Sequence, residues 1–200
     1  MPSLLQSLRL SLPPMRINFP LALTIGRVAA IPLVLGLFYV DWPHARQWAC
    51  GLFTVAGITD WLDGYLARKW NQTSKFGAFL DPVADKLLVA ISLVMLLRDE
   101  PGGVMAVLVA VIIGREITIS ALREWLAELG QRTTVAVSAI GKVKTGFQMT
   151  AIGLMLWQQP LYGLPIYELG YLCLFVAAAL TIWSMVVYLR AAWPLLRESM

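Results

Sequence analysis

The sequence predicts an all-helical integral membrane protein with six transmembrane helices, a short N-terminal surface helix and both termini in the cytoplasm. Hydrophobic residues make up 58% of the 200 residues and charged residues only 14%, whereas soluble globular proteins have about 25% charged residues. Apolar runs such as 104–113 lack the polar alternation of barrel strands. Because each spanning helix needs roughly 20 apolar residues, a chain of this length has room for about six spans and no separate soluble domain.

Helix-breaking segments separate the apolar stretches. On one side of the membrane these segments are 41–44, 98–103 and 158–165, and on the other side they are 70–74 and 130–134. We expect spans near 22–40, 46–69, 76–97, 103–127, 138–158 and 167–190. The chain then divides into a juxtamembrane segment, the membrane domain and a tail, at 1–21, 22–193 and 194–200.

The juxtamembrane segment carries leucines at helical spacing with Arg9 off their stripe. This pattern indicates either a surface helix at 3–12 on the cytoplasmic face or a frayed terminus. The distribution of basic residues gives the orientation, because Lys and Arg are retained on the cytoplasmic side. Only Arg46 and Arg98 lie near the loops after spans one, three and five, so we expect both termini in the cytoplasm.

The other reactive residue types do not form a recognisable site. The only cysteines, Cys50 and Cys173, fall inside apolar stretches without access to oxidant, so we expect two free thiols. His44, the only histidine, lies in a predicted extracytoplasmic loop. One histidine and two distant cysteines do not make a zinc site.

Four aspartates fall inside the predicted spans: Asp60, Asp63, Asp81 and Asp85. A carboxylate deep in the bilayer costs about 2.5–3.5 kcal/mol, which excludes four isolated charges. Their i,i+3 and i,i+4 spacings place each pair on one helix face, and an antiparallel hairpin can turn these faces toward each other. Because hard divalent cations choose carboxylate oxygens, we expect the four to bind two Mg²⁺ or Mn²⁺ ions.

The alternative is that the aspartates cap helix ends or pair with nearby lysines, Lys69, Lys75 and Lys86. A cap uses one carboxylate per helix end, whereas these lie one to three turns inside their helices, which favours the metal site. Small residues continue the two helix faces that carry the aspartates, and they suit either a bound ligand or close helix packing. These residues are Gly64, Ala67 and Gly77. Arg68 lies one turn nearer the cytoplasm than Gly64, and its guanidinium can bind a phosphate through two parallel hydrogen bonds.

Together these residues form the pattern D-x-x-D-G-x-x-A-R, eight residues, G-x-x-x-D-x-x-x-D over 60–85. This pattern resembles the signature of the CDP-alcohol phosphotransferases, with every fixed position filled. The resemblance implies a six-helix homodimer whose cytoplasm-facing site holds a CDP-linked substrate and two divalent metal ions. It implies that the metal ligands are Asp60, Asp63, Asp81 and Asp85, with Asp85 also the general base. It further implies that the CDP-linked substrate contacts Asp60, Asp63, Gly64, Ala67, Arg68, Ser74 and Gly77.

Further motifs resemble one bacterial subgroup of this family. They are Asn18-x-Pro20 with Leu23-Thr24-x-x-Arg27, Arg115-Glu116-x-x-x-Ser120-x-x-Arg123-Glu124, and Ser138-x-x-Gly141-Lys142-x-Lys144-Thr145. Leu21 departs from this resemblance, because many members have Asn there. The subgroup implies CDP-diacylglycerol as donor, sn-glycerol 3-phosphate as acceptor and the bacterial cytoplasmic (inner) membrane as location. Membrane lipids are then the surroundings, and no nucleic-acid partner is expected.

A basic cluster is expected to bind the acceptor phosphate, and its members are Arg115, Arg123, Lys142 and Lys144. Arg115 needs a partner at its depth in span four. Adjacent residues point about 100° apart on a helix, so we expect Glu116 to pair with Arg123 instead. Anchoring to anionic lipid head groups is the alternative role for the two lysines. A neutral or cationic acceptor such as choline would gain nothing from this cluster.

The expected reaction is phosphatidyl transfer, in which the acceptor hydroxyl attacks the diacylglycerol-bearing phosphorus, CMP leaves and Asp85 accepts the proton. Within the family, an inositol phosphate or phosphatidylglycerol is the alternative acceptor. An ion-coupled transporter also buries aspartates, but between repeats, and the other half of the sequence has no second D-x-x-D-like segment. A prenyltransferase also uses aspartate-rich motifs with Mg²⁺ to hold a diphosphate. It would require neither the nucleotide-binding pattern nor the pair of lysines, Lys142 and Lys144.

Overall fold

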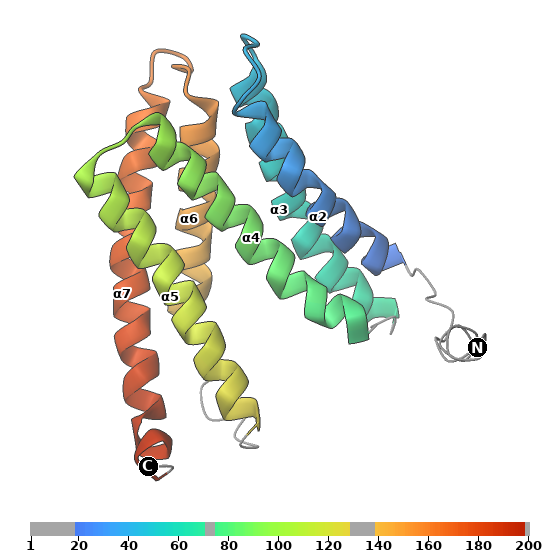
Figure 1. The fold of residues 1–200 in the computed structure, drawn as a ribbon, viewed down its shortest axis with the longest axis vertical. Helices are drawn as coiled ribbons and strands as arrows, with labels where there is room; N and C mark the ends of the chain where they lie inside the picture. Colours follow the sequence, from blue (N-terminus) through green and yellow to red (C-terminus); the bar gives the residue numbers. More distant parts are fainter. Residues whose placement is uncertain (1–18, 71–74, 129–138, 199–200) are drawn as a thin grey trace, which may run out of the picture.

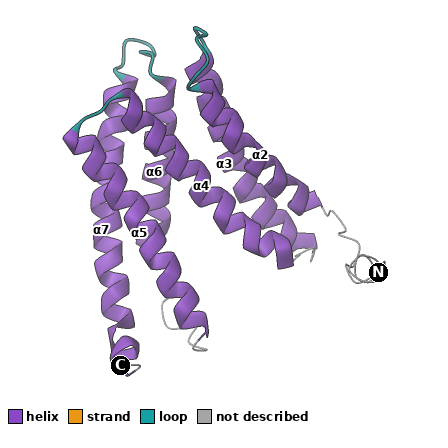
Figure 2. Cartoon of the chain, in the orientation of Figure 1, coloured by secondary structure: helices purple, strands orange, loops and turns teal. Residues whose placement is uncertain are grey.

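The computed structural model describes residues 19–70, 75–128 and 139–198, and these residues form six helices (Figures 1 and 2). The helices are α2 (Phe19–Leu37), α3 (Ala45–Trp70), α4 (Lys75–Asp99), α5 (Gly103–Glu128), α6 (Ala139–Trp157) and α7 (Ile166–Glu198). Each lies within a few residues of a predicted span, except that α7 continues beyond 190. The surface helix expected at 3–12 lies outside the described residues.

Successive helices run in opposite directions. The loops after α2, α4 and α6 lie at one end of the bundle, at the top of Figure 1, and α7 ends at the opposite end. This up-and-down order is the one that the six predicted spans require. It brings the second half of α3 and the first half of α4, which carry the aspartates, to the same end.

All six described helices contribute to one apolar core, which lies in the half of the bundle near these loops. Fully buried members include Val34, Phe53, Leu93, Ile112 and Met155. The opposite half holds a smaller cluster in which α5 packs against α7: Ile119, Leu126, Tyr188 and Ala192. This packing stabilises the continuation of α7.

Large apolar side chains are exposed on every described helix. Examples are Leu33, Val55, Phe79, Val107 and Trp183. A water-soluble protein rarely exposes apolar surface on this scale, whereas a bilayer favours it. Two helices are long and apolar enough to cross a membrane by length and composition alone, Gly103–Glu128 and Ile166–Pro194. The fold is thus all-helical and of the membrane type, while six spans and cytoplasmic termini stay predictions.

The two basic residues near the predicted extracytoplasmic loops have local partners. Arg46 forms an ion pair with Asp99, which links the start of α3 to the end of α4, and its guanidinium lies 3.8 Å from the centre of the Phe38 ring. Arg98 lies 4.2 Å from the centre of the Tyr39 ring. The prediction of free thiols at Cys50 and Cys173 is confirmed.

Candidate active site

Two polar side chains of α2 contact two of the predicted metal ligands. Arg27 donates a hydrogen bond from Nη1 to Oδ1 of Asp60 on α3 at 2.5 Å, and the Thr24 hydroxyl donates to Oδ1 of Asp81 on α4 at 2.5 Å. Arg27 is 2% exposed and Thr24 is 1% exposed. Because they are three residues apart, one face of α2 reaches both aspartate-bearing helices. Helix α2 thus positions carboxylates that belong to two different helices.

Asp85 belongs to the same region, because the charges of Asp60 and Arg27 both act on its carboxylate. The side chain of Asp60 is 42% exposed and so accessible to a ligand. Asp63 lies in α3, but its side chain is outside the described part of the structure. Among the side chains that are described, no three potential ligands are close enough to define a metal site. The donor chemistry of three carboxylates near one helix hairpin nevertheless fits a hard divalent cation.

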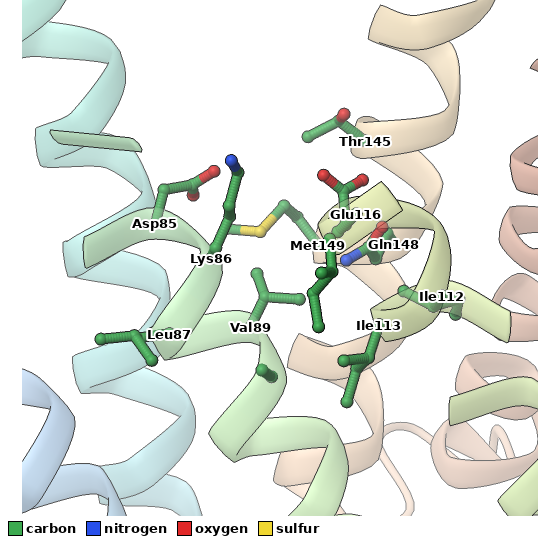
Figure 3. Close-up of a pocket in the computed structure, with 12 residues that line it drawn as sticks. Asp85, Lys86, Leu87, Val89, Ile112, Ile113, Glu116, Thr145, Gln148 and Met149 are labelled. Atoms are coloured by element: carbon green, nitrogen blue, oxygen red, sulfur yellow. The ribbon is translucent and has the colours of Figure 1, made fainter. Parts of the chain in front are cut away.

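A cavity of about 190 Å³ lies between α4, α5 and α6 (Figure 3). Asp85 and Lys86 reach into it from α4, and Glu116, Thr145 and Gln148 face them from α5 and α6. The remaining walls are apolar. The cavity therefore extends from the predicted base, Asp85, to Glu116.

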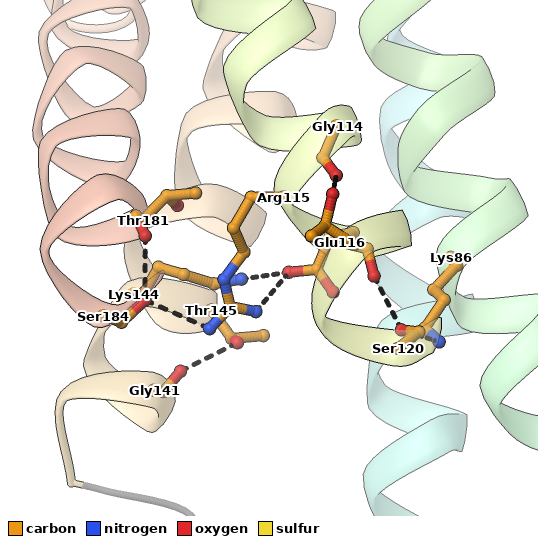
Figure 4. Close-up of polar contacts among 11 residues, drawn as sticks. Lys86, Gly114, Arg115, Glu116, Ser120, Gly141, Lys144, Thr145, Thr181 and Ser184 are labelled. Atoms are coloured by element: carbon orange, nitrogen blue, oxygen red, sulfur yellow. Dashed lines mark hydrogen bonds and ion pairs between the residues drawn. The ribbon is translucent and has the colours of Figure 1, made fainter. Parts of the chain in front are cut away.

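Glu116, which lines the cavity, is also the centre of a polar cluster (Figure 4). Arg115 donates from Nη1 to Glu116 Oε1 at 3.3 Å and from Nη2 to Ser184 Oγ at 3.1 Å. The Lys144 ammonium forms an ion pair with the same carboxylate oxygen. Lys144 is 3% exposed, so in this structure it pairs inside the bundle and does not reach lipid head groups.

The expectation that Glu116 pairs with Arg123 is wrong. Seven residues along a helix correspond to roughly 10 Å of rise, whereas the long Arg115 side chain bends back to its sequence neighbour. Arg123 instead lies over the ring of Tyr188 on α7, 5.5 Å from its centre. Of the predicted acceptor residues, the structure joins Arg115 and Lys144 through Glu116, and the charge of Arg123 acts on both of them. Lys142 lies in α6, but its side chain is not described.

The predicted nucleotide side of the site is only partly described. Gly77 is buried at the start of α4. Gly64, Ala67 and Arg68 lie in α3 without described side-chain environments, and Ser74 falls outside the described residues.

Sequence reasoning missed the roles of several polar residues around the site. Thr24 and Arg27 were visible only as parts of a motif, although a charge inside an apolar helix is itself a signal that a partner exists. Lys86 was considered only as a partner for the aspartates, yet its ammonium donates to Ser120 Oγ on α5. Gln148, which lines the cavity, is 4% exposed and gave no sequence signal.

Comparison with known proteins adds independent information. The sequence model of the CDP-alcohol phosphatidyltransferase family matches residues 17–186. The chain is similar to proteins named CDP-diacylglycerol–glycerol-3-phosphate 3-phosphatidyltransferase from Salmonella typhimurium, Shigella flexneri and Escherichia coli strain K12. Each is 49% identical over 178 residues, which cover 89% of this chain and 96% of the relative.

Proposed function

Because this chain belongs to the CDP-alcohol phosphatidyltransferase family, we propose that it transfers the phosphatidyl group of CDP-diacylglycerol to sn-glycerol 3-phosphate. The products are phosphatidylglycerol phosphate and CMP. The observation that carries the proposal is the sequence identity to relatives that are named for this reaction. The identity is 49%, and the alignment covers 96% of the length of each relative. The location of Asp85 in a cavity next to a basic cluster supports it chemically.

The site residues act in three groups. The metal ligands are Asp60, Asp63, Asp81 and Asp85, and two Mg²⁺ or Mn²⁺ ions bound there would neutralise charge on the diphosphate and on the leaving CMP. Asp85 accepts the proton of the attacking hydroxyl, and its access to the cavity supports this role. The CDP-diacylglycerol head group lies against Gly64, Ala67, Arg68, Ser74 and Gly77.

The acceptor phosphate binds next to the buried polar cluster. Arg115 and Lys144 supply positive charge from α5 and α6, and Lys142 and Arg123 are the other two residues proposed to bind the phosphate. Two buried cations that share one carboxylate keep a net positive charge, which favours an anionic acceptor over choline. The hydroxyl of the acceptor then reaches Asp85 through the cavity.

The proposed setting is the bacterial inner membrane, with six spans, both termini in the cytoplasm and the site open to the cytoplasm. The lipid tails of the donor can stay in the bilayer while its head group enters between the helices. The exposed apolar side chains on all six described helices support this setting. The protein acts as a homodimer in this proposal.

The test is an acceptor panel with purified protein in mixed micelles. CDP-diacylglycerol and Mg²⁺ are combined with sn-glycerol 3-phosphate, an inositol phosphate or phosphatidylglycerol, and both CMP and the lipid product are measured by mass spectrometry. We expect phosphatidylglycerol phosphate from the first acceptor and little product from the others. A preference for another acceptor would overturn the acceptor assignment, and no CMP release with any of them would overturn the transferase.

A further inference from the structure

Lys86 occupies a distinctive place between the two halves of the proposed site. It follows Asp85 on α4, and both side chains reach into the 190 Å³ cavity (Figure 3). Its charge acts on Asp85 on one side and on Glu116 on the other. Of the described residues that line this cavity, Lys86 is the one with a positive charge. Arg115 and Lys144 lie behind the Glu116 carboxylate (Figure 4).

The charges of this region are better balanced for a phosphate when Lys86 is included. Within the ion-paired cluster, Arg115 and Lys144 contribute two positive charges and Glu116 one negative charge, which leaves one positive charge. A phosphomonoester carries about −1.5 to −2 charges at pH 7. Lys86 raises the net charge from one to two, which matches that of the ligand. Asp85 is excluded from this sum because it belongs to the proposed metal site.

The contacts of Lys86 in the structure are suited to exchange. Its ammonium donates to the Ser120 hydroxyl, and that hydroxyl donates to the Glu116 carbonyl oxygen at 2.6 Å. No ion pair joins Lys86 to a carboxylate among the described residues. A half-buried ammonium that is held by a neutral hydroxyl gains from a stronger anionic partner.

We propose that Lys86 is an acceptor-binding residue whose ammonium leaves Ser120 to contact the acceptor phosphomonoester as it enters the cavity. The contact holds the acceptor between Asp85 and the buried Arg115–Lys144 pair, so that the hydroxyl meets the base. This inference rests on the proposed function, because it takes the acceptor to be an anionic phosphomonoester.

Steady-state kinetics with one substrate varied at a time test the assignment. Lys86→Gln should raise the KM for sn-glycerol 3-phosphate about 10- to 150-fold, the effect of one charge-assisted hydrogen bond, and change the KM for CDP-diacylglycerol little. Lys86→Arg should restore part of the loss because it keeps the charge. Arg98→Gln is the matched control, since it removes one positive charge from the other end of α4, where Arg98 lies over Tyr39.

Ser120→Ala separates binding from a structural role. If Lys86 serves only to hold α4 against α5 through Ser120, Lys86→Gln and Ser120→Ala should both lower thermal stability, and each should change the two KM values equally. If Lys86 binds the acceptor, Ser120→Ala should leave the acceptor KM within about twofold of wild type. Equal effects of Lys86→Gln and Ser120→Ala would overturn the proposal.

A second measurement uses the unaltered protein and does not depend on the folding of a variant. Lysine acetylation followed by mass spectrometry should show Lys86 protected by sn-glycerol 3-phosphate and not by glycerol. Unchanged acetylation would contradict the contact. Product formation by the wild-type protein from the same acceptor is measured in parallel. If no product forms, the proposed function is wrong. If product forms normally but Lys86 is not protected, only the role of Lys86 is wrong.

Discussion

Thr24 and Arg27 show how single side chains of α2 organise carboxylates on other helices. Each is almost fully buried, and each donates a hydrogen bond to a different predicted metal ligand. Residues that orient metal ligands typically change metal affinity by about 10- to 100-fold when they are replaced. The contacts of α2 therefore lead to a prediction about metal binding.

Thr24→Val should weaken Mn²⁺ binding about 10- to 100-fold, because Asp81 loses its hydrogen-bond donor. Asp81→Asn, which removes the charge of the predicted ligand itself, should abolish activity in a protein that is still folded. Electron paramagnetic resonance of free Mn²⁺ measures binding without turnover. Thr118→Val is the control, since the exposed Thr118 hydroxyl donates to the Gly114 carbonyl of its own helix, α5. Normal Mn²⁺ affinity in Thr24→Val would refute the positioning role, and full activity in EDTA would refute the metal site.

The acceptor and donor sites should respond to different substitutions. Lys144→Gln should raise the KM for sn-glycerol 3-phosphate roughly 10- to 150-fold, because it removes a charge-assisted contact near the cavity. Arg68→Gln should instead raise the KM for CDP-diacylglycerol. Kinetics in mixed micelles distinguish the two effects. If Lys144→Gln affected both substrates equally, the basic cluster would have to be assigned to something other than the acceptor.

The sequence drew attention to the aspartates because carboxylates inside apolar spans, at i,i+3 and i,i+4 spacing, require partners, and their role as metal ligands stays a prediction. Their partners Arg27 and Thr24 were not predictable, because the register of α2 against α3 and α4 depends on packing. The pairing of Glu116 was also mispredicted. Helix geometry gives the direction of a Cα–Cβ bond, but the end of a long arginine side chain can reach a neighbour that this direction excludes.

At the scale of helices, the close contact between α6 and α7 depends on Gly170. A Cβ atom there would lie 2.8 Å from Met155 Cγ, 3.0 Å from Leu154 Cβ and 3.0 Å from the Met155 backbone nitrogen. Backbone cannot move aside as readily as the end of a side chain. The sequence showed a glycine in an apolar helix but not which surface it faces.

Gly170→Ala should therefore destabilise the protein by about 1–3 kcal/mol, the usual cost of overpacking. At Gly51 in α3 a Cβ atom would meet nothing within 4 Å, so Gly51→Ala should be neutral or stabilising because alanine favours the helix. Thermal unfolding in detergent, followed by tryptophan fluorescence, measures both. Similar midpoints for the two variants would contradict the packing described for α6 and α7.

The helices were predictable as elements because hydropathy and helix-breaking residues follow the chain locally. The exception is α7, which continues to Glu198 where the sequence predicted an end near 190. Tyr188 and Ala192 pack against Ile119 and Leu126 of α5, and this tertiary contact favours helix beyond the apolar run. Packing between helices that are distant in sequence was not visible in the local pattern.

On the scale of the whole molecule, the larger apolar core lies near the loops after α2, α4 and α6, and the aspartates, Lys86 and the Glu116 cluster lie beyond it toward the opposite end. A membrane enzyme with a water-soluble acceptor needs polar groups toward one end, because the acceptor must enter from the aqueous side while the lipid stays in the bilayer. The proposed orientation places that end toward the cytoplasm.

Cysteine labelling tests this orientation. In a protein with Cys50 and Cys173 replaced by serine, cysteines introduced at Asn71 and Arg132 should react with an impermeant reagent only after the inner membrane is opened. A cysteine at Pro160 should react in intact spheroplasts. The reverse pattern would place the site on the outside, away from a cytoplasmic supply of CDP-linked lipid and glycerol phosphate.

The most direct test of the central claim follows the oxygen that forms the new bond. sn-Glycerol 3-phosphate labelled with ¹⁸O in its C1 hydroxyl is turned over with CDP-diacylglycerol, and both products are analysed by mass spectrometry. Attack by that hydroxyl on the lipid-bearing phosphorus predicts ¹⁸O in phosphatidylglycerol phosphate, in the phosphodiester bridge, and none in CMP. Label in the nucleotide, or CMP released without labelled lipid, would contradict phosphatidyl transfer by this protein.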